Sequence, residues 1–157
     1  MTILILVATM SGNAEMVADE IAGRIEDDGG TASILRMEKA SVTTLAGATG
    51  PVLICSSTYG TGDVPDNGAA LYAALQAERP DLAHLRYGVI ALGDSVYPQT
   101  FCFGGRKFDE LLASLGAQRV GDRLEHDARS GIYAEDAAGD WVETWLRDLE
   151  MMGENGR

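Results

Sequence analysis

The feature that most constrains this chain is an alternation of short aliphatic runs with segments of helical hydrophobic spacing. Residues 3–8, 52–55 and 87–92 are almost wholly apolar, which is typical of parallel strands buried on both faces. Between these runs, apolar residues recur every three or four positions, as they do along a helix that packs on a sheet. The alternation predicts an α/β fold in which helices cover both faces of a parallel sheet.

Weaker signals complete the order of elements. Further strands are predicted at residues 32–37 and at about 118–124, and helices at about 14–28, 66–78, 108–115 and 141–149. Trp141 and Trp145 lie four residues apart on the last helix and are interpreted as core residues. We expect one domain over residues 1–150, followed by a polar tail over residues 151–157.

The charge of the chain limits its partners. Of its 157 residues, 24 are acidic and 12 are basic, so the formal net charge at pH 7 is −12. Such a charge repels nucleic acids and anionic lipid, whose binding depends on Lys and Arg. It suits docking to a basic partner, although a solvated acidic surface explains it equally well.

The cysteines and the first residues indicate the compartment. Cys55 and Cys102 fit neither a disulfide framework nor a metal-ligand spacing, so no metal site is expected. Residues 1–8 have no basic stretch and no small-residue cleavage site, and are interpreted as a strand rather than a signal peptide. No apolar run approaches the roughly 20 residues of a membrane span. The expected location is therefore cytoplasmic.

The first aliphatic run leads directly into Thr9-Met10-Ser11-Gly12-Asn13-Ala14, where a helix is predicted to begin. A helix N-terminus carries unpaired backbone N–H groups and a partial positive charge. Hydroxyls, an amide and a glycine at such a point are able to hold a phosphate without Lys or Arg. The spacing matches neither the P-loop nor the Gly-x-Gly-x-x-Gly pattern, and a simple helix cap is the alternative interpretation.

Two further loops follow buried strands, and each carries a tyrosine. The loop over residues 56–67 contains Tyr59, and the loop over residues 93–102 contains Tyr97. Because the carboxyl ends of parallel strands meet at one edge of the sheet, both rings are expected beside the first loop. The two tyrosines and the first loop together predict a binding slot for a planar ring that carries a phosphate. Either tyrosine alone would be interpreted as a surface side chain with its hydroxyl in water.

The motifs Thr-Met-Ser-Gly-Asn-Ala, Ser-Thr-Tyr-Gly-Thr-Gly-Asp-Val-Pro-Asp-Asn and Leu-Gly-Asp-Ser-Val-Tyr-Pro-Gln-Thr-Phe-Cys resemble the three FMN-binding loops of flavodoxins. The resemblance is strongest to the small MioC-type flavodoxins and extends to the FMN domains of diflavin reductases. It covers about residues 2–149 and leaves no room for the insertion of long-chain flavodoxins. It implies a short-chain flavodoxin with an open five-stranded parallel sheet in the order 2-1-3-4-5.

The resemblance also implies which residues bind FMN. Those implied for the phosphate are Thr9, Met10, Ser11, Gly12, Asn13 and Ala14. Tyr59 and Tyr97 would flank the isoalloxazine ring. Those implied around the ring and the ribityl chain are Ser57, Thr58, Gly60, Gly62, Leu92, Gly93, Asp94, Phe101, Cys102 and Asp127. Among them, the Gly60 carbonyl would turn toward flavin N5 when the ring takes up a proton, and Asp127 would lie near the ribityl hydroxyls.

Such a protein is expected to be a low-potential one-electron carrier, in which the flavin supplies the redox chemistry and the protein tunes it. Asp63, Asp66 and Asp94 are expected near the ring, where their negative field disfavours the addition of an electron. No catalytic residue is predicted, since His84 and His126 are interpreted as solvated or structural. We therefore expect an electron-transfer protein rather than an enzyme.

The expected electron donor is a flavin- or nicotinamide-dependent reductase, the expected acceptor is a redox enzyme with a basic docking patch, and the carrier is expected to be a monomer. The alternative function is an FMN-dependent quinone or nitro-compound reductase. A phospho-receiver domain is disfavoured, because Thr9 and Ser11 stand where it needs clustered acids. A scaffold without cofactor is a further alternative. Cys55 is interpreted as a packing thiol, and Cys102 as a ring contact rather than a reactive thiol.

Overall fold

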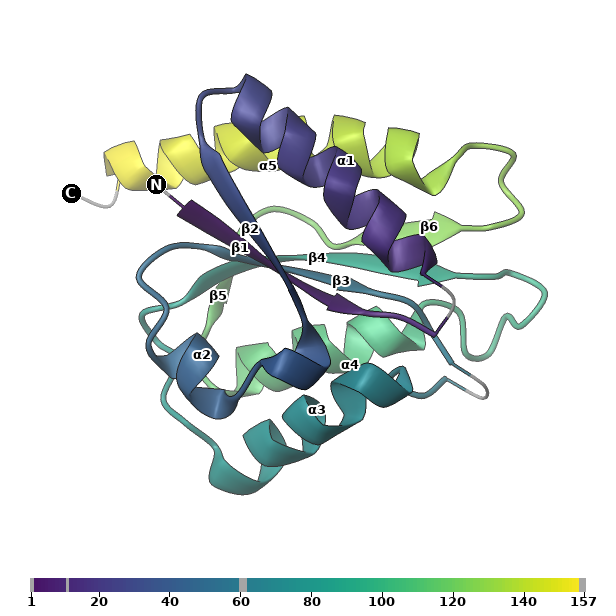
Figure 1. Cartoon of the computed structure of the whole chain (residues 1–157), viewed down its shortest axis with the longest axis horizontal. Helices are drawn as coiled ribbons and strands as arrows, with labels where there is room; N and C mark the ends of the chain where they lie inside the picture. The colour runs from purple at the N-terminus through teal and green to yellow at the C-terminus, as the bar shows by residue number, and fades with distance from the viewer. Residues whose placement is uncertain (1, 11, 60–61, 156–157) are drawn as a thin grey trace.

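The computed structural model describes residues 2–10, 12–59 and 62–155, which form one sheet between two layers of helices (Figure 1). The elements, in chain order, are β1 Thr2–Ala8, α1 Asn13–Asp27, β2 Thr31–Arg36, the 3-10 turn η1 Met37–Lys39, α2 Val42–Ala46, β3 Val52–Ser56, α3 Asp66–Glu78, β4 Arg86–Gly93, α4 Phe103–Ser114, β5 Gln118–Arg119, β6 Leu124–Asp127 and α5 Ala134–Asn155.

The sheet has the strand order β2-β1-β3-β4-β5, and β6 pairs with β4 beside β5. All the pairings are parallel, so the predicted order 2-1-3-4-5 is confirmed. Helices α1 and α5 cover one face of the sheet, and α2, α3 and α4 cover the other (Figure 1). This arrangement gathers the loops that follow β1, β3, β4 and β6 at a single edge.

The aliphatic runs are buried because each strand contributes to two cores. In β3, Val52 and Ile54 pack with the helices α3 and α4, whereas Leu53 and Cys55 pack with α1 and α5. Every residue of β3 is buried. Side chains that alternate between two covered faces must all be apolar, which explains why the run shows no period of two. The predicted packing role of Cys55 is confirmed by its complete burial.

The prediction of one strand over residues 118–124 is wrong in detail. The structure has two short strands here, β5 and β6, and both pair with β4. Gly121 has a positive φ of 68°, a conformation that glycine adopts without strain. The carbonyl of Asp122 accepts a hydrogen bond from Trp141 Nε1 at 3.0 Å. The chain therefore leaves the sheet at this point and the last helix holds it there.

Other boundaries differ from prediction as well, since α4 begins at Phe103 and α5 at Ala134, each more than one turn earlier than expected. Met37 belongs to η1 rather than to β2, although its side chain is fully buried. Helix α5 continues to Asn155, so the segment expected to be a tail is mostly helical. Trp145 is a core residue as predicted, whereas Trp141 is only half-buried and stacks on it with ring centroids 6.2 Å apart. None of the helices in the described part of the chain is long and apolar enough to cross a membrane.

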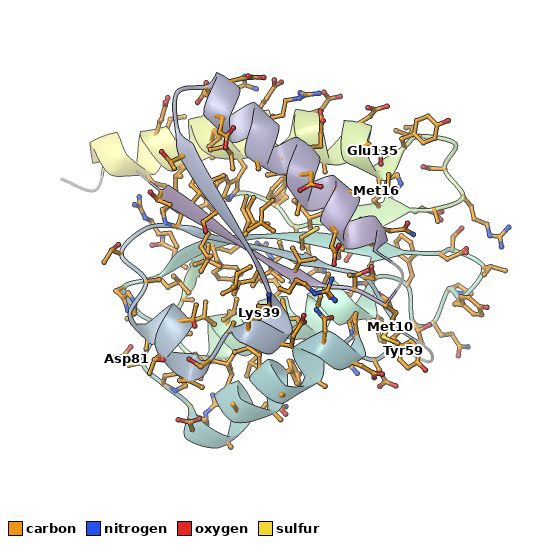
Figure 2. The ribbon with its side chains drawn as sticks, viewed as in Figure 1. Met10, Met16, Lys39, Tyr59, Asp81 and Glu135 are labelled. Carbon is orange, nitrogen blue, oxygen red and sulfur yellow. The ribbon has the colours of Figure 1, made fainter. Side chains whose placement is uncertain are left out.

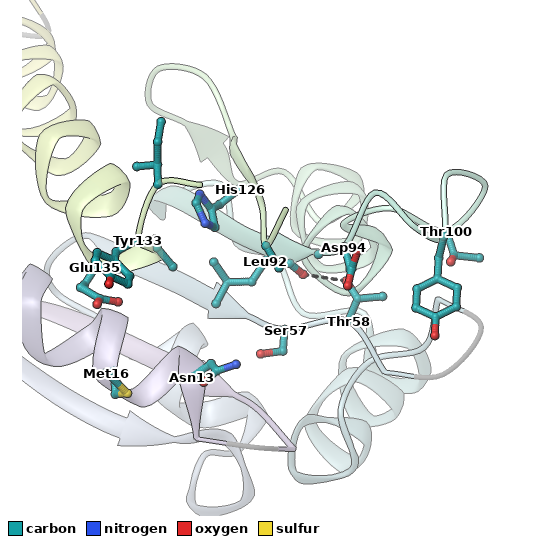
Figure 3. Close-up of a pocket in the computed structure, with 15 residues that line it drawn as sticks. Asn13, Met16, Ser57, Thr58, Leu92, Asp94, Thr100, His126, Tyr133 and Glu135 are labelled. Atoms are coloured by element: carbon teal, nitrogen blue, oxygen red, sulfur yellow. Dashed lines mark hydrogen bonds between the residues drawn. The ribbon is translucent and has the colours of Figure 1, made fainter. Parts of the chain in front are cut away.

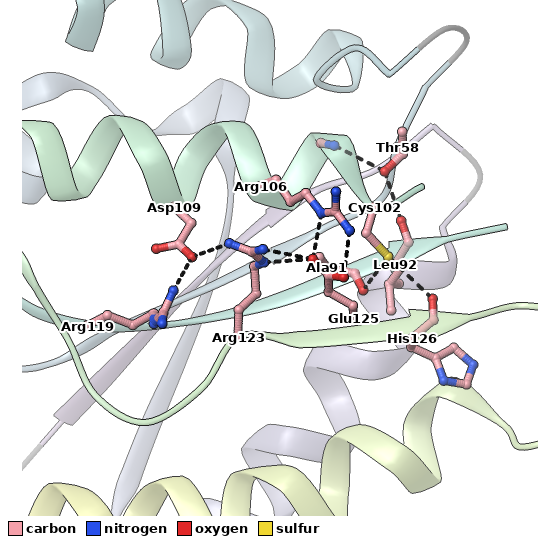
Figure 4. Close-up of polar contacts among 11 residues, drawn as sticks. Thr58, Ala91, Leu92, Cys102, Arg106, Asp109, Arg119, Arg123, Glu125 and His126 are labelled. Carbon is pink, nitrogen blue, oxygen red and sulfur yellow. Dashed lines mark hydrogen bonds and ion pairs between the residues drawn. The ribbon is translucent and has the colours of Figure 1, made fainter. Parts of the chain in front are cut away.

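An ionic cluster links α4 to the broken edge of the sheet (Figure 4). Asp109 of α4 accepts hydrogen bonds from Arg119 and Arg123, at 2.6 Å each. It also accepts one from the hydroxyl of Tyr87, a fully buried residue of β4, at 2.6 Å. In the same cluster, Arg106 makes two bonds to Glu125, at 2.6 and 2.8 Å. The cluster supplies polar contacts where the ladder of backbone hydrogen bonds is interrupted.

Candidate functional site

A cleft of about 650 Å³ opens at the edge of the sheet where the strands end (Figure 3). Its volume is typical of a site for a small molecule or a cofactor. The loops after β3, β4 and β6 and the first turns of α1 and α5 contribute its walls. The lining residues are Asn13, Met16, Ser57, Thr58, Leu92, Gly93, Asp94, Tyr97, Thr100, His126, Ala128, Ile132, Tyr133, Ala134 and Glu135. Seven of these were predicted to bind the cofactor, namely Asn13, Ser57, Thr58, Leu92, Gly93, Asp94 and Tyr97.

The first predicted loop lies at the start of α1. Gly12 precedes the helix with a φ of 87°, which few residues other than glycine adopt. Its N–H donates to Thr9 Oγ1 at 3.1 Å, and Ser57 Oγ donates to the same oxygen at 3.4 Å. The N-cap residue of α1 is Gly12, so the cap residue itself contributes no side-chain hydrogen bond. The predicted residue Ser11 lies outside the described part, so the alternative of a serine cap stays open.

The second loop is tied to the third by Thr58. Its hydroxyl donates to the carbonyl of Leu92 at 3.0 Å (Figure 3) and accepts from the N–H of Gly104 at 3.1 Å. Gly104 packs so closely on the carbonyl of Ser57 that a side chain there would collide with it. The start of α4 therefore presses directly on this loop. Tyr59 follows with its side chain 44% exposed, while the predicted residue Gly60 lies outside the described part of the chain.

The third loop exposes Tyr97, whose side chain is 63% accessible, beside a paired aspartate. Asp94 Oδ1 accepts from the N–H of Val96 at 2.9 Å and from Arg129 Nε at 2.8 Å. These two bonds, the backbone one foremost, hold the pKa of Asp94 below its ordinary value. The carboxylate is therefore charged, but Arg129 offsets part of the negative field that the sequence predicts at the ring.

The other two predicted acids are exposed and do not line the cleft. Asp63 is exposed, with Oδ1 3.6 Å from the amine of Lys107. Asp66 is exposed at the start of α3. Neither residue lines the cleft, so they act on it through solvent, where charges are strongly screened.

Several predicted ring contacts do not line the cleft, namely Tyr59, Gly62, Phe101 and Cys102. The side chain of Cys102 is fully buried, and its Sγ donates to the carbonyl of Ala91 at 3.4 Å. Burial raises the pKa of this thiol to about 12, so the thiol stays protonated, and its complete burial leaves no exposed surface for a ring contact here. Phe101 is half-buried and packs against the core under α4. The correction arises because Cys102 turns inward with a φ of 58° at the start of α4.

Asp127 lies at the rim of the cleft, between the lining residues His126 and Ala128. Its Oδ1 accepts hydrogen bonds from the N–H groups of Ser95, at 3.0 Å, and Arg129, at 2.9 Å. The first of these bonds crosses from the loop after β6 to the loop after β4. Hydrogen bonding keeps the pKa of Asp127 below its ordinary value. In this structure the side chain of Asp127 links two loops at the rim of the cleft and does not line the cleft itself.

Several lining residues were not predicted. His126 is buried at the end of β6, where it pairs in register with Leu92. Met16 lies one turn into α1, Ile132 and Tyr133 belong to the connection between β6 and α5, and Glu135 lies in the first turn of α5. Figure 2 shows Met10, Met16, Tyr59 and Glu135 toward the same end of the molecule, far from Asp81. The unpredicted lining residues could have been found from the sequence by their position near the end of a strand or in the first turns of a helix.

The comparisons with known proteins agree with this geometry. Residues 5–141 match the family described as Flavodoxin. The chain belongs to the flavodoxin family.

Relatives of this flavodoxin are similar over nearly its whole length. It is 43% identical over 142 residues to flavodoxin YqcA of Pectobacterium carotovorum subsp. carotovorum, covering 90% of this chain and 92% of the relative. It is 36% identical to protein MioC of Escherichia coli O157:H7, covering 88% and 92%. It is 37% identical to the sulfite reductase [NADPH] flavoprotein alpha-component of Vibrio cholerae, covering 93% of this chain and 23% of that protein.

A solved structure agrees as well. A cysteine-to-alanine mutant of flavodoxin from Pseudomonas aeruginosa superposes with a TM-score of 0.85 at 35% identity, covering 96% of this chain and 99% of that one. The chain is therefore an FMN-binding electron carrier of the flavodoxin family. The comparisons give no support to the alternative of a quinone or nitro-compound reductase.

The donors of the cleft fit FMN. Asn13 and Ser57 line the cleft with an amide and a hydroxyl near the start of α1. Thr9 and Gly12 lie next to them, joined to Ser57 through Thr9 Oγ1, and a helix N-terminus favours an anion. The described residues that line the cleft include neither Lys nor Arg. Uncharged donors are sufficient for a phosphate at such a point. At the other end of the cleft, Tyr97 offers an exposed ring face for a planar group.

Proposed function

We propose that this flavodoxin holds FMN with its phosphate at the start of α1 and its ring between Tyr59 and Tyr97. In that position it would pass single electrons at low potential from a flavin- or nicotinamide-dependent reductase to a redox enzyme with a basic surface. The observation that carries the proposal is the meeting of uncharged phosphate donors and an exposed tyrosine ring in one cleft. The cofactor supplies the redox chemistry, and the residues of the chain bind, orient and shield it.

The ring slot depends on the link between the second and third loops. Thr58 joins them through Leu92 and Gly104, so the two tyrosine-bearing segments are held on a common support. A ring inserted between exposed aromatic faces gains about 0.5–1.5 kcal/mol beyond the burial of its area. Tyr59 and Tyr97 are 44% and 63% exposed, and this exposed area is what a flavin would cover.

The surface around the cleft supports docking to a partner with a basic patch. The chain carries a net charge of −12, which steers a cationic partner and accelerates association at low salt. Exposed apolar side chains surround the cleft and supply area for the contact itself. They are Met10, Met16, Val96, Ile132 and Tyr133. We expect the flavodoxin to act as a monomer in the cytoplasm, where its two free and buried cysteines stay reduced.

Titration of the purified protein with FMN tests the proposal. We expect flavin absorbance to be retained through purification, quenching of flavin fluorescence on addition of FMN to apoprotein, and two separate one-electron steps during reductive titration. A folded protein that leaves FMN fluorescence unchanged would contradict the proposal. Oxidation of NAD(P)H by the protein alone, without a reductase, would instead favour the enzymatic alternative.

The partner part of the proposal has its own test. Electron transfer to a cationic acceptor, such as cytochrome c, should slow as sodium chloride is raised, because salt screens the attraction between the two surfaces. A rate that does not change with salt would exclude acidic docking while leaving FMN binding intact.

A further inference from the structure

Asn67 lies outside the cleft, yet its side chain contacts the point where β1 passes into the phosphate loop. It is the second residue of α3. Its Oδ1 accepts from the N–H of Thr9 at 2.8 Å, and its Nδ2 donates to the carbonyl of Val7 at 3.1 Å. The same Nδ2 also donates to Glu38 Oε2 at 2.8 Å. Three separate segments of the chain are thus joined through one carboxamide.

This carboxamide makes the hydrogen bonds to the end of β1 that a further residue of β2 would make. The carbonyl of Ala8 accepts a bond from the chain after β3, so the neighbouring carbonyl of Val7 and N–H of Thr9 point to the opposite side, toward β2. The last pair between β1 and β2 is Val7 with Arg36, and η1 begins at the next residue. A carboxamide carries the same donor and acceptor as a peptide group. Asn67 therefore replaces the strand residue that β2 lacks.

The position of Thr9 determines the geometry of the loop that follows. Thr9 is 5% exposed, and its Oγ1 accepts from the N–H of Gly12 at 3.1 Å. Ser57 Oγ reaches the same oxygen at 3.4 Å. Loss of the bond from Asn67 would leave a buried N–H without its partner, which costs more than an ordinary hydrogen bond contributes. The displacement would pass from Thr9 to Gly12 at the start of α1.

We propose that Asn67 is a positioning residue for the FMN phosphate, acting through Thr9 and Gly12 without touching the cofactor. The inference rests on the proposed function, because it takes the start of α1 as the phosphate site. Glu38 supports the carboxamide from behind. Hydrogen bonds from Arg36 foremost, and from Asn67, hold the pKa of Glu38 below its ordinary value, so it remains a charged acceptor for the amide.

A comparison of FMN with riboflavin separates positioning of the phosphate from general stability. Riboflavin carries the same ring and ribityl chain without the phosphate. Apoprotein of the wild type and of Asn67→Ala is titrated with each flavin, and the two dissociation constants are read from fluorescence quenching. We expect Asn67→Ala to weaken FMN binding about tenfold while the dissociation constant for riboflavin stays within about twofold. The ratio of the two constants is the quantity that decides.

Gln76→Ala is the matched control, because it removes a carboxamide from an exposed position of the same helix. It should leave both dissociation constants unchanged. If Asn67→Ala weakens FMN and riboflavin equally, or changes neither, the positioning role is wrong. If the wild type itself binds FMN no more tightly than riboflavin, the phosphate site of the proposed function fails together with this inference.

Two further variants keep the test decisive if Asn67→Ala does not fold. Asn67→Gln retains the carboxamide on a longer arm, which cannot meet Val7 and Thr9 in the same geometry, and it should lower the preference for FMN. Glu38→Ala removes only the support behind the amide and should lower the preference by a smaller factor. A full wild-type preference in both variants would overturn the proposal.

Discussion

Two ionic contacts of this flavodoxin use the same chemistry in different surroundings. At the rim of the cleft, Asp94 Oδ1 lies 2.8 Å from Arg129 Nε, and the two side chains are 33% and 59% exposed. Between α4 and the broken edge of the sheet, Asp109 binds both Arg119 and Arg123 at 2.6 Å, and its side chain is 5% exposed. The two contacts have similar bond lengths, but the pair at the rim is exposed to water whereas Asp109 is buried.

The difference separates stability from function in this molecule. An ion pair in water contributes little, because solvent and salt screen it. Removing one partner of a buried pair is costly, because it leaves an uncompensated charge away from water. We therefore expect the pair at the rim to affect the charge beside the cleft more than the stability of the fold. The cluster around Asp109 is expected to stabilise the packing of α4 on the sheet.

The largest effect is expected from breaking the buried cluster. Asp109→Ala should lower the free energy of unfolding by about 3–5 kcal/mol, since two arginines and the hydroxyl of Tyr87 lose their shared acceptor. Urea unfolding monitored by circular dichroism measures it. Asp94→Ala is the comparison at the rim, and it should leave stability nearly unchanged. Equal losses in the two variants would show that burial does not distinguish the two contacts.

The second largest effect is expected on FMN binding at the cleft, without a change in the cluster around Asp109. Tyr97→Ala should weaken FMN binding by about 1–3 kcal/mol through lost stacking. The free energy of unfolding of the apoprotein should change by less than about 0.5 kcal/mol, because the side chain is largely exposed. Tyr97→Phe keeps the ring and should bind FMN nearly as well as the wild type. An unchanged dissociation constant for Tyr97→Ala would reject the proposed ring slot.

The third effect is the response of stability to acid. Hydrogen bonds from Arg106 and Arg123 hold the pKa of Glu125 below its ordinary value in the folded state. Its contribution to stability is therefore complete above the ordinary pKa of about 4.3 and is lost as the pH falls through the lower, folded-state pKa. As the pH falls from the ordinary pKa to the folded-state pKa, wild-type unfolding should become easier, and Glu125→Gln should flatten this part of the curve.

The same measurement on Asp94→Asn sharpens the comparison. The pKa of Asp94 is also lowered, but its exposure leaves more of the interaction to solvent screening. The flattening should therefore be weaker than for Glu125→Gln. A stronger one would mean that the pair at the rim contributes more to the fold than its exposure indicates.

The smallest effect on stability is expected from Arg129→Ala. It should leave the unfolding curve almost unchanged and move the FMN midpoint potentials to more negative values, because Asp94 loses its counter-charge beside the cleft. A redox titration measures the shift. A potential that stays the same would show that this charge does not act on the cofactor site.

The sequence predicted most of the fold because burial on two faces leaves a clear pattern. The aliphatic runs at β1, β3 and β4 were recognised from this pattern, whereas the strand order was implied by the resemblance to flavodoxins. Asn13, Ser57, Thr58 and Tyr97 reach the cleft as expected. The break between β5 and β6 was missed, although Gly121 and Asp122 form a turn signal. That break depends on contacts with α4 and α5, which lie far away along the chain.

The sequence by itself determined where β1, β3 and β4 end and which small and hydroxyl-bearing residues follow them, because hydrophobic burial and turn chemistry are local in the chain. The tertiary structure decided which of those residues face the cleft. Cys102 turns into the core, Asp127 joins two loops, and Asn67 reaches the end of β1 from another helix. Each outcome depends on a partner that is distant in sequence, and the direction of a side chain follows from packing against that partner.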